Sequence, residues 1–367
     1  MRIGQVTMCG DNYGACLQAY ALQHVLKANG CDIEFVRYNR SDENGKENFL
    51  KKINKLGLDG VVKYILEYSF IKNRKDAYNR FRNNYIRMSE CSYDKLSNLD
   101  ELAGLYDTFI CGSDMIWSEE FQDDWDFYFL NFVAKEKSNS YAPSFGKNSL
   151  TDDNKKRVKE FLEKFNRVTC REEGGVELVR SISNVDAHQV LDPTMLLSAE
   201  EWMKVIGTRE RIIKEPYVFM YLFGKDDVNR IRYIKDIECF YGKAYKLPFS
   251  KKETKRFPVK SVGPIEYIRL FKDAEFVITD TFHGLMFSMI FNKQFVVLDR
   301  SDTSKWAKYS DRMTSTLKMF GLYDRYVYAD KMFAKDLKEI NYEYINKTII
   351  EKRNEAMEYL MGIVREK

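Results

Sequence analysis

Strand and helix patterns alternate along this chain, and the alternation starts over in the second half. Near the N-terminus a strand pattern at residues 2–7 precedes a helical pattern at 15–28 and a second strand pattern at 32–38. A new series opens with a strand pattern at 217–223 and a helical one at 228–241. Strands that alternate with helices predict parallel sheets covered by helices. We therefore expect an α/β protein made of two doubly wound domains.

The boundary between these domains is expected where a proline follows the last strand pattern of the first half. Residues 186–191 lead to Asp192, Pro193 and Thr194. Shortly afterwards, Ser198 and Glu201 have the spacing of a helix capping box. We read this segment as the linker.

Three parts of the chain follow from this boundary. An N-terminal domain is expected at 1–192, a C-terminal domain at 193–345 and a C-terminal helix at 346–367. Residues 41–100 are rich in Lys, Asn, Tyr and Phe, and we interpret them as a helical insertion in the first domain. A length of 367 residues suits two domains of ordinary size.

Composition narrows the class of protein. The 59 basic and 55 acidic residues are interspersed and give a net charge of only +4, so a nucleic-acid partner is not expected. The basic stretch at 251–256 reads as a solvated loop. Seven scattered cysteines without a C-x-x-C pair indicate free thiols in a reducing cytoplasm and no zinc site.

Targeting and cofactor signals are also missing from the sequence. The chain begins with a strand pattern rather than a signal peptide, and no stretch approaches the ~20 apolar residues of a membrane span. We expect a cytoplasmic protein, for which contact with the surface of a membrane stays open. Neither G-x-x-x-x-G-K-[ST] nor G-x-G-x-x-G occurs, so no nicotinamide or flavin cofactor is expected.

The clearest candidate for chemistry is His283, one of only three histidines. An apolar strand pattern at 274–278 runs into Thr279-Asp280-Thr281-Phe282-His283-Gly284, and an apolar helix follows. Open α/β sheets bind their ligands at the carboxyl ends of strands, and helix N-termini favour anions. The position suits proton transfer on an anionic substrate. The alternative is a helix-capping or core histidine, and we expect His24 and His188 to be structural.

Other predicted strands end in small and charged residues as well. One ends in Gly112-Ser113-Asp114, and another in Arg171-Glu172-Glu173. Because the carboxyl ends of parallel strands share one edge, we expect these tips to converge. Asp114 can orient a hydroxyl group or cap a helix. Arg171 can bind a carboxylate or phosphate, or pair with a neighbouring glutamate at the surface.

Two further segments are candidates for anion binding. The loop Asn12-Tyr13-Gly14 lies beside a helix N-terminus, which attracts anions. Arg312 is either a second cationic clamp or an ordinary arginine in the first turn of a helix. The residues alone do not separate these two interpretations.

These turns, in this order, resemble those of the polysaccharide pyruvyl transferase family. The matching runs are Asn12-Tyr13-Gly14-Ala15-Cys16-Leu17-Gln18-Ala19-Tyr20-Ala21-Leu22-Gln23, Gly112-Ser113-Asp114-Met115-Ile116-Trp117, Ser140-Tyr141-Ala142-Pro143-Ser144-Phe145-Gly146, Arg171-Glu172, Val190-Leu191-Asp192-Pro193-Thr194, Gly263-Pro264, Thr279-Asp280-Thr281-Phe282-His283-Gly284 and Arg312. Each run alone is a weak signal, but together they cover most of the chain outside 41–100 and the C-terminal tail.

The resemblance implies two Rossmann-like domains in a glycosyltransferase-B-like arrangement. It also implies transfer of the enolpyruvyl group of phosphoenolpyruvate to two hydroxyls of one sugar, which gives a pyruvate ketal and phosphate. Such a reaction would belong to exopolysaccharide or capsule biosynthesis. Phosphoenolpyruvate would be a co-substrate, and neither a resident cofactor nor a metal is expected. The acceptor would be a nucleotide-linked or lipid-linked sugar, and a lipid-linked one would bring the protein to the inner face of the membrane.

The resemblance also assigns roles to residues. His283 would transfer protons, and Arg171 and Arg312 would bind anions. Asp114 and Asp192 would orient the acceptor or partner side chains. Further substrate contacts would come from Asn12, Gly14, Ser113, Thr281 and Gly284.

One position departs from the family pattern. Some relatives have an arginine two positions before the histidine, where this chain has Thr281. Arg312 or the helix N-terminus at Gly284 would then have to supply the missing phosphate contact.

Two other functions stay open at this point. One is a glycosyltransferase with a nucleotide-sugar donor, whose diphosphate would lie at the same helix N-terminus. The other is a non-catalytic sugar-binding or assembly partner. Replacement of His283 by alanine would abolish turnover in an enzyme and leave such a binding partner unaffected.

Overall fold

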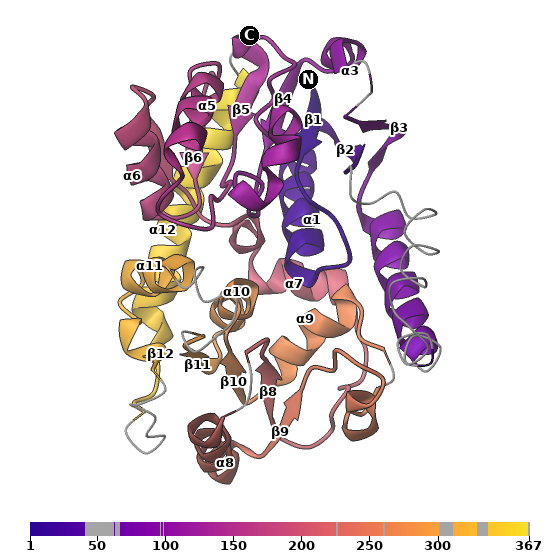
Figure 1. Ribbon diagram of the computed structural model, residues 1–367. Helices are drawn as coiled ribbons and strands as arrows, with labels where there is room; N and C mark the ends of the chain where they lie inside the picture. The colour runs from indigo at the N-terminus through magenta and orange to yellow at the C-terminus, as the bar shows by residue number, and fades with distance from the viewer. Residues whose placement is uncertain are drawn as a thin grey trace. The chain divides into compact units, whose positions relative to one another are not determined.

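The computed structural model describes residues 1–40, 62, 67–95, 97, 99–224, 227–259, 261–300, 311–328 and 337–365. The chain divides into two compact units. Unit 1 comprises Met1–Pro193 and Ala356–Lys367, and unit 2 comprises Thr194–Glu355. Each unit contains a five-stranded parallel sheet whose strands are connected through helices (Figure 1). The α/β class predicted from the sequence is therefore confirmed.

The sheet of unit 1 has the strand order β3-β2-β1-β4-β5. Its strands are β1 (Arg2–Val6), β2 (Asp32–Asn39), β3 (Met88–Asp94), β4 (Thr108–Cys111) and β5 (Ser138–Ser140). Two more strands, β6 (Val168–Cys170) and β7 (Ala187–Gln189), form a small parallel sheet next to β5, to which a bridge between Asn139 and Arg167 connects it. The carboxyl ends of β4, β5 and β6 therefore share one edge, where open α/β sheets bind ligands.

Aromatic packing holds the segment that follows β4. The ring of Trp117 stacks on Phe129 with centroids 4.8 Å apart, and Phe129 stacks on Phe161 at 5.0 Å. Such pairs contribute about 0.5–1.5 kcal/mol each beyond the area they bury. The helices of unit 1 include α1 (Tyr13–Ala28), α3 (Leu99–Leu105), α4 (Trp125–Tyr128), α5 (Asp152–Leu162) and α6 (Glu173–Ile182). The loop that carries Gly112 to Asp114 is thus anchored by a rigid core on its C-terminal side.

The sheet of unit 2 has the strand order β12-β11-β10-β8-β9. These strands are β8 (Tyr217–Tyr221), β9 (Lys243–Lys246), β10 (Phe276–Thr279), β11 (Gln294–Leu298) and β12 (Tyr326–Val327). Every residue of β8 and β10 is buried, as expected for the middle of a parallel sheet. The helices include α7 (Ala199–Ile206), α8 (Val228–Tyr241), α9 (Pro264–Asp273), α10 (Phe282–Ile290) and α11 (Asp311–Met319). The predicted capping box at the start of α7 is confirmed, because Ser198 and Glu201 exchange both hydrogen bonds.

The last helix, α12 (Tyr342–Arg365), starts in unit 2 and ends in unit 1. In unit 2 the hydroxyl of Tyr342 donates to the carbonyl of Lys293 at 2.5 Å. In unit 1 the hydroxyl of Tyr359 donates to the carbonyl of Ser140 at 3.1 Å. The helix begins before residue 346, the predicted start, because Asn341 caps it through a hydrogen bond from the Glu343 amide.

The helical interpretation of residues 41–100 is partly wrong. The described residues 67–85 are helical, but β3 at Met88–Asp94 is the edge strand of the sheet. Only Ser89 and Tyr93 of this strand are buried, so it lacks the apolar run that indicates a strand. Residues 41–61, which belong to the same interpretation, lie outside the described part of the chain.

Within the described ranges, no helix is long and apolar enough to cross a membrane.

Candidate functional site

In unit 1 a close approach between two loops builds the polar edge of the sheet. Gly112, directly after β4, has φ of 110°, a backbone conformation that favours glycine. A side chain at this position would also clash with the carbonyl oxygen of Tyr141 and with Pro143. The sequence therefore needs glycine here, and the loop after β4 can lie against the loop after β5.

This approach buries Ser113 completely. Its hydroxyl lies 2.9 Å from the carbonyl oxygen of Ala142 and 3.2 Å from Oδ2 of Asp192, so its single proton can serve either acceptor. Its backbone amide donates to Oε1 of Gln18 at 3.1 Å. Ser113 thus connects α1, the loop after β5 and Asp192.

Arg171 lies at the centre of the same network, after β6. Its side chain is 1% exposed, Nε donates to Glu172 at 2.8 Å and Nη1 donates to Asp192 at 3.2 Å. Burial opposes the charged guanidinium, but the carboxylates of Glu172, Asp192 and Asp114 outweigh it and raise the pKa of Arg171 above its ordinary value. The pairing with Glu172 that the sequence allowed is present, but it is buried rather than at the surface.

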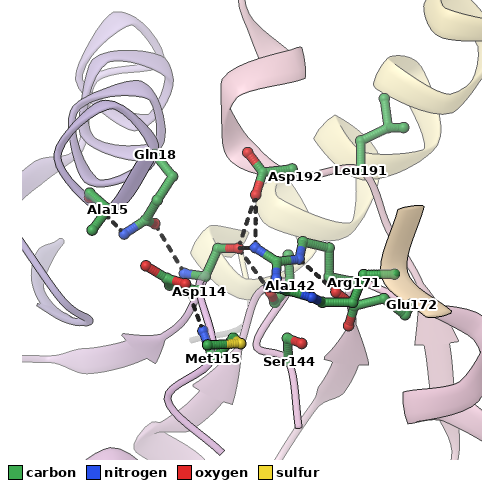
Figure 2. A network of polar contacts seen from close by, with 12 residues as sticks. Ala15, Gln18, Asp114, Met115, Ala142, Ser144, Arg171, Glu172, Leu191 and Asp192 are labelled. Carbon is green, nitrogen blue, oxygen red and sulfur yellow. Dashed lines mark hydrogen bonds and ion pairs between the residues drawn. The ribbon is translucent and has the colours of Figure 1, made fainter. Parts of the chain in front are cut away.

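Asp114 is half-buried and stands in the left-handed backbone region, with φ of 66°. Its Oδ1 accepts a hydrogen bond from the Met115 amide at 2.8 Å, and its carbonyl accepts one from the Ser144 amide at 2.8 Å. The residues after it form a turn and not a helix, so the alternative role as a helix cap does not apply. Both contacts hold the carboxylate at the edge of the network (Figure 2).

Sequence reasoning missed Gln18 as a member of this network. It is fully buried on α1, and its Nε2 lies within 3.0 Å of Thr7 Oγ1 and of the carbonyl oxygens of Met8 and Ala15. The sequence feature that could have indicated it is a polar residue between Leu17 and Ala19 in an otherwise apolar helix. A buried amide at such a position needs hydrogen-bond partners.

The loop before α1 is where the sequence placed it. Asn12 is the exposed N-cap of the helix, and its Oδ1 accepts from the Ala15 amide at 3.1 Å. Gly14 is buried in the first turn. Both belong to the same unit as Ser113, and Gln18 on the same helix connects them to the network.

In unit 2 the predicted site lies at the step from β10 to α10. Thr281 is the N-cap, and its Oγ1 accepts from the Gly284 amide at 3.0 Å. A side chain on Gly284 would clash with the hydroxyls of Thr279 and Thr281, so the turn requires glycine. His283 stands half-buried in the first helical turn, with its ring edge-on to Phe282 at 5.4 Å. Because Thr281 caps the helix, His283 does not have that role.

Arg312 reaches the same step from another element. It lies half-buried in the first turn of α11, with its guanidinium 5.8 Å from the ring centre of Phe282. The ring of Phe282 therefore contacts both the guanidinium of Arg312 and the imidazole of His283. Unit 2 therefore brings together Thr281, His283, Gly284 and Arg312, whereas unit 1 brings together Ser113, Asp114, Arg171 and Asp192.

A second buried carboxylate in unit 2 was not singled out from the sequence. Asp280 is fully buried at the end of β10, and it accepts from the amides of Phe223 at 2.9 Å and Gly224 at 2.7 Å. Two arginines, Arg230 and Arg300, also contact it. The sequence feature that could have indicated Asp280 is an aspartate directly after an otherwise apolar strand.

The other two histidines have local partners. Nδ1 of His24 lies 3.1 Å from the hydroxyl of Tyr20, and the exposed His188 lies 3.0 Å from Asp186. All seven cysteines are free thiols, with the sulfurs of Cys9 and Cys16 3.7 Å apart. In the described part of the chain, no group of three His, Cys, Asp or Glu residues is arranged to hold a metal ion.

Comparison with known proteins gives one family and a set of distant folds. The family model for polysaccharide pyruvyl transferase matches residues 12–302. A search of curated proteins finds no matching sequence.

Solved structures resemble the chain at low identity. UDP-GlcNAc 2-epimerase from Methanocaldococcus jannaschii, in complex with UDP-GlcNAc and UDP, has a TM-score of 0.46 and 15% identity, over 96% of this chain and 93% of that one. The enzyme from Neisseria meningitidis has a TM-score of 0.43 and 11% identity, over 97% and 100%. The spinosyn rhamnosyltransferase SpnG has a TM-score of 0.39 and 9% identity, over 97% and 96%.

Proposed function

This chain belongs to the polysaccharide pyruvyl transferase family, and from that membership we propose that it transfers the enolpyruvyl group of phosphoenolpyruvate to two hydroxyls of one sugar. The products would be a cyclic pyruvate ketal and phosphate. The observation that carries the proposal is the family match over residues 12–302, which includes the β10–α10 step with His283.

The reaction makes defined demands on a protein. Carbon 3 of phosphoenolpyruvate gains a proton, and one sugar hydroxyl adds to carbon 2 and loses its own proton. Phosphate then leaves carbon 2, and the second hydroxyl adds there with loss of a second proton. The site must therefore supply groups that give and take protons, and partners for a carboxylate and a phosphate.

His283 is our candidate for proton transfer. An imidazole gives and takes protons near neutral pH, and this one is half-buried at the carboxyl end of a central strand. The first turn of α10 lies beside it, where backbone amides favour a bound anion. We assign to Thr281 and Gly284 the role of shaping that turn, because the hydroxyl of Thr281 holds the amide of Gly284.

For anion binding we propose Arg312 and Arg171. Arg312 and His283 both contact the ring of Phe282, and the first-turn position of Arg312 on α11 fits this role. Arg171 is already held by Glu172 and Asp192, so an anion that binds it has to compete with one of these carboxylates. Ser113 and Asp192 hold Arg171, and we assign acceptor orientation to Asp114, with support from the loop of Asn12 and Gly14.

The acceptor in this proposal is a sugar of a nucleotide-linked or lipid-linked precursor, in the biosynthesis of an exopolysaccharide or capsule. Family membership supports a sugar acceptor in general. A lipid-linked acceptor would place the reaction at the inner face of the membrane.

The test is an incubation of the purified protein with phosphoenolpyruvate and a panel of sugar acceptors. We expect phosphate release that depends on the acceptor. A ketal and a singly attached enolpyruvyl ether have the same mass, so proton NMR must distinguish them. The ketal gives a methyl singlet, and the ether gives vinyl protons. Phosphate release without a sugar, or a product that retains the vinyl protons, contradicts ketal formation.

A further inference from the structure

The buried carboxylate of Asp280 is shared by two arginines in unit 2. Nη2 of Arg230 donates to its Oδ2 at 3.2 Å, and Nε of Arg300 lies 3.3 Å from its Oδ1. A side chain on Gly224 would clash with Arg230 and with Asp280, so the loop after β8 needs glycine to pass this cluster. The fold therefore holds Asp280, Arg230 and Arg300 in a defined arrangement, and none of these three residues has a role in the function proposed above.

The two arginines differ in how the protein uses them. The side chain of Arg230 is 2% exposed, and it also donates to the carbonyl of Asp299 at 3.4 Å. The guanidinium of Arg230 therefore pairs with groups inside the fold. The side chain of Arg300 is 11% exposed, and its guanidinium lies 5.4 Å from the ring centre of Phe223, which is 47% exposed. Arg300 is thus the member of the pair that lies closer to solvent.

The carboxylates of Asp280 and Asp299 balance the charges of Arg230 and Arg300, so an anion would bind Arg300 through the hydrogen-bond donors of its guanidinium and not through a surplus of positive charge. Asp280 carries one negative charge and meets two guanidinium groups and two backbone amides. The carboxylate of the neighbouring Asp299 accepts a hydrogen bond from the hydroxyl of Tyr326. The contact between Arg300 and Asp280 is an ion pair in which the buried Nε makes no hydrogen bond. An oxyanion near Arg300 would therefore gain a charge-assisted partner without removing one that Asp280 requires.

The position of this cluster relates it to His283. Asp280 precedes His283 by three residues, at the carboxyl end of β10. Arg300 follows β11, which pairs directly with β10 through Thr279 and Val297. Arg300 and Arg312 thus reach the turn before α10 from two different elements, through Asp280 and Phe282 respectively.

We propose that Arg300 binds the phosphate group of the substrate at the N-terminal turn of α10, with Asp280 and Phe223 fixing the direction of its guanidinium. The identity of that substrate as phosphoenolpyruvate rests on the function proposed above. This assignment gives the site a cation that Thr281 does not provide, from the residues that follow the neighbouring strand β11.

The experiment is calorimetric titration of the full-length protein with inorganic phosphate and with phosphoenolpyruvate. We expect Arg300→Gln to weaken both affinities by about 10- to 100-fold, as loss of a charged hydrogen-bonding partner does. The affinities of Arg300→Lys should lie between those of wild type and Arg300→Gln, because lysine keeps the charge but lacks the planar guanidinium. The matched control is Arg232→Gln, which removes an exposed arginine from α8 of the same unit and should leave both affinities unchanged.

Thermal unfolding of each variant shows whether the fold survives. Arg300→Gln should unfold close to wild type, since Asp280 keeps Arg230 and two amides. Wild-type affinity in Arg300→Gln overturns the inference, and so does a wild-type protein that binds neither anion. If Arg300 is required for binding but no ketal forms with any acceptor, this inference stands and the proposed function fails.

Discussion

His283 occupies the first turn of α10 and does not serve as its cap, which is Thr281. We predict that His283→Ala lowers the rate of ketal formation by about 10²- to 10⁴-fold, the usual contribution of a general acid or base. The affinity for phosphoenolpyruvate should change little, since the arginines and amides that we propose as its anion-binding groups remain. Acceptor-dependent phosphate release measures the rate.

The control for this substitution is His188→Ala, which removes an exposed histidine whose partner is Asp186. It should keep the wild-type rate. Wild-type turnover in His283→Ala would remove the proton-transfer role.

Gly284 is the second position where one residue decides the local structure. Gly284→Ala forces a methyl group against the hydroxyls of Thr279 and Thr281, so we predict a loss of about 1–3 kcal/mol in the free energy of unfolding. Denaturant titration measures it. Gly104→Ala in α3 is the matched control, because open space surrounds that position and alanine favours a helix. Equal stability of the two variants would show that the turn relaxes around the methyl group.

At the scale of elements, a buried ion pair joins Arg171, directly after β6, to Asp192, which directly precedes the chain's exit from unit 1. Asp192→Ala would leave Arg171 in a buried position with one of its two carboxylates gone. We predict a loss of about 3–5 kcal/mol in the free energy of unfolding, as for other buried pairs that lose one partner. Lys352→Ala, which breaks an exposed pair with Glu355 on α12, should change stability little. A mild effect of Asp192→Ala would mean that water or Glu172 compensates for the loss.

A second prediction at this scale concerns the start of α5. Glu119 accepts from the amide and hydroxyl of Thr151 at 3.0 and 3.1 Å and from Asn154 at 2.7 Å. Partial burial raises its pKa, but these hydrogen bonds, chiefly that from Asn154, outweigh it and lower the pKa below its ordinary value. A carboxyl group with a lowered folded pKa stabilises the protein above its unfolded pKa, and the gain is lost as pH falls through the folded pKa.

Glu119→Gln should therefore be less stable than wild type at pH 7. The difference should shrink as the pH drops below about 4.3, the usual value for glutamate. Denaturant titrations of both proteins across that range test this. If the difference in the free energy of unfolding between the two proteins does not depend on pH, the charge of Glu119 is not its cause, and a change in the local packing or hydrogen bonding is.

The sequence was informative about elements and less so about pairs of residues. β4, β8 and β10 are fully buried and consist mostly of apolar residues, so their positions were predictable. The edge strand β3 was not, because only two of its residues face the core. Asp280 and Arg230 are 50 residues apart, and no local pattern shows that they meet. The turn around His283 was predictable because its strand, cap and glycine are contiguous.

At the scale of the whole molecule, the chain leaves unit 1 after Pro193 and returns to it at Ala356. The returning part of α12 contributes Ala356, Leu360 and Ile363 as buried residues. We predict that Leu360→Ala lowers the free energy of unfolding of unit 1 by about 2–5 kcal/mol. Glu358→Ala, an exposed change on the same helix, should not.

Hydrogen exchange read by mass spectrometry locates the effect of these changes. In Leu360→Ala, faster exchange should appear in peptides from β4 and β5, which belong to unit 1. Faster exchange in β8 and β10 alone would contradict the assignment of this part of α12.

The path of α12 has a consequence for the order of events during synthesis. Unit 2 is one uninterrupted stretch of chain, whereas unit 1 is split between the two ends of the sequence. A ribosome therefore delivers all of unit 2 before the last segment of unit 1 is translated. The earlier-made part of unit 1 must therefore wait, without the buried side chain of Leu360, until residues 356–367 have been translated.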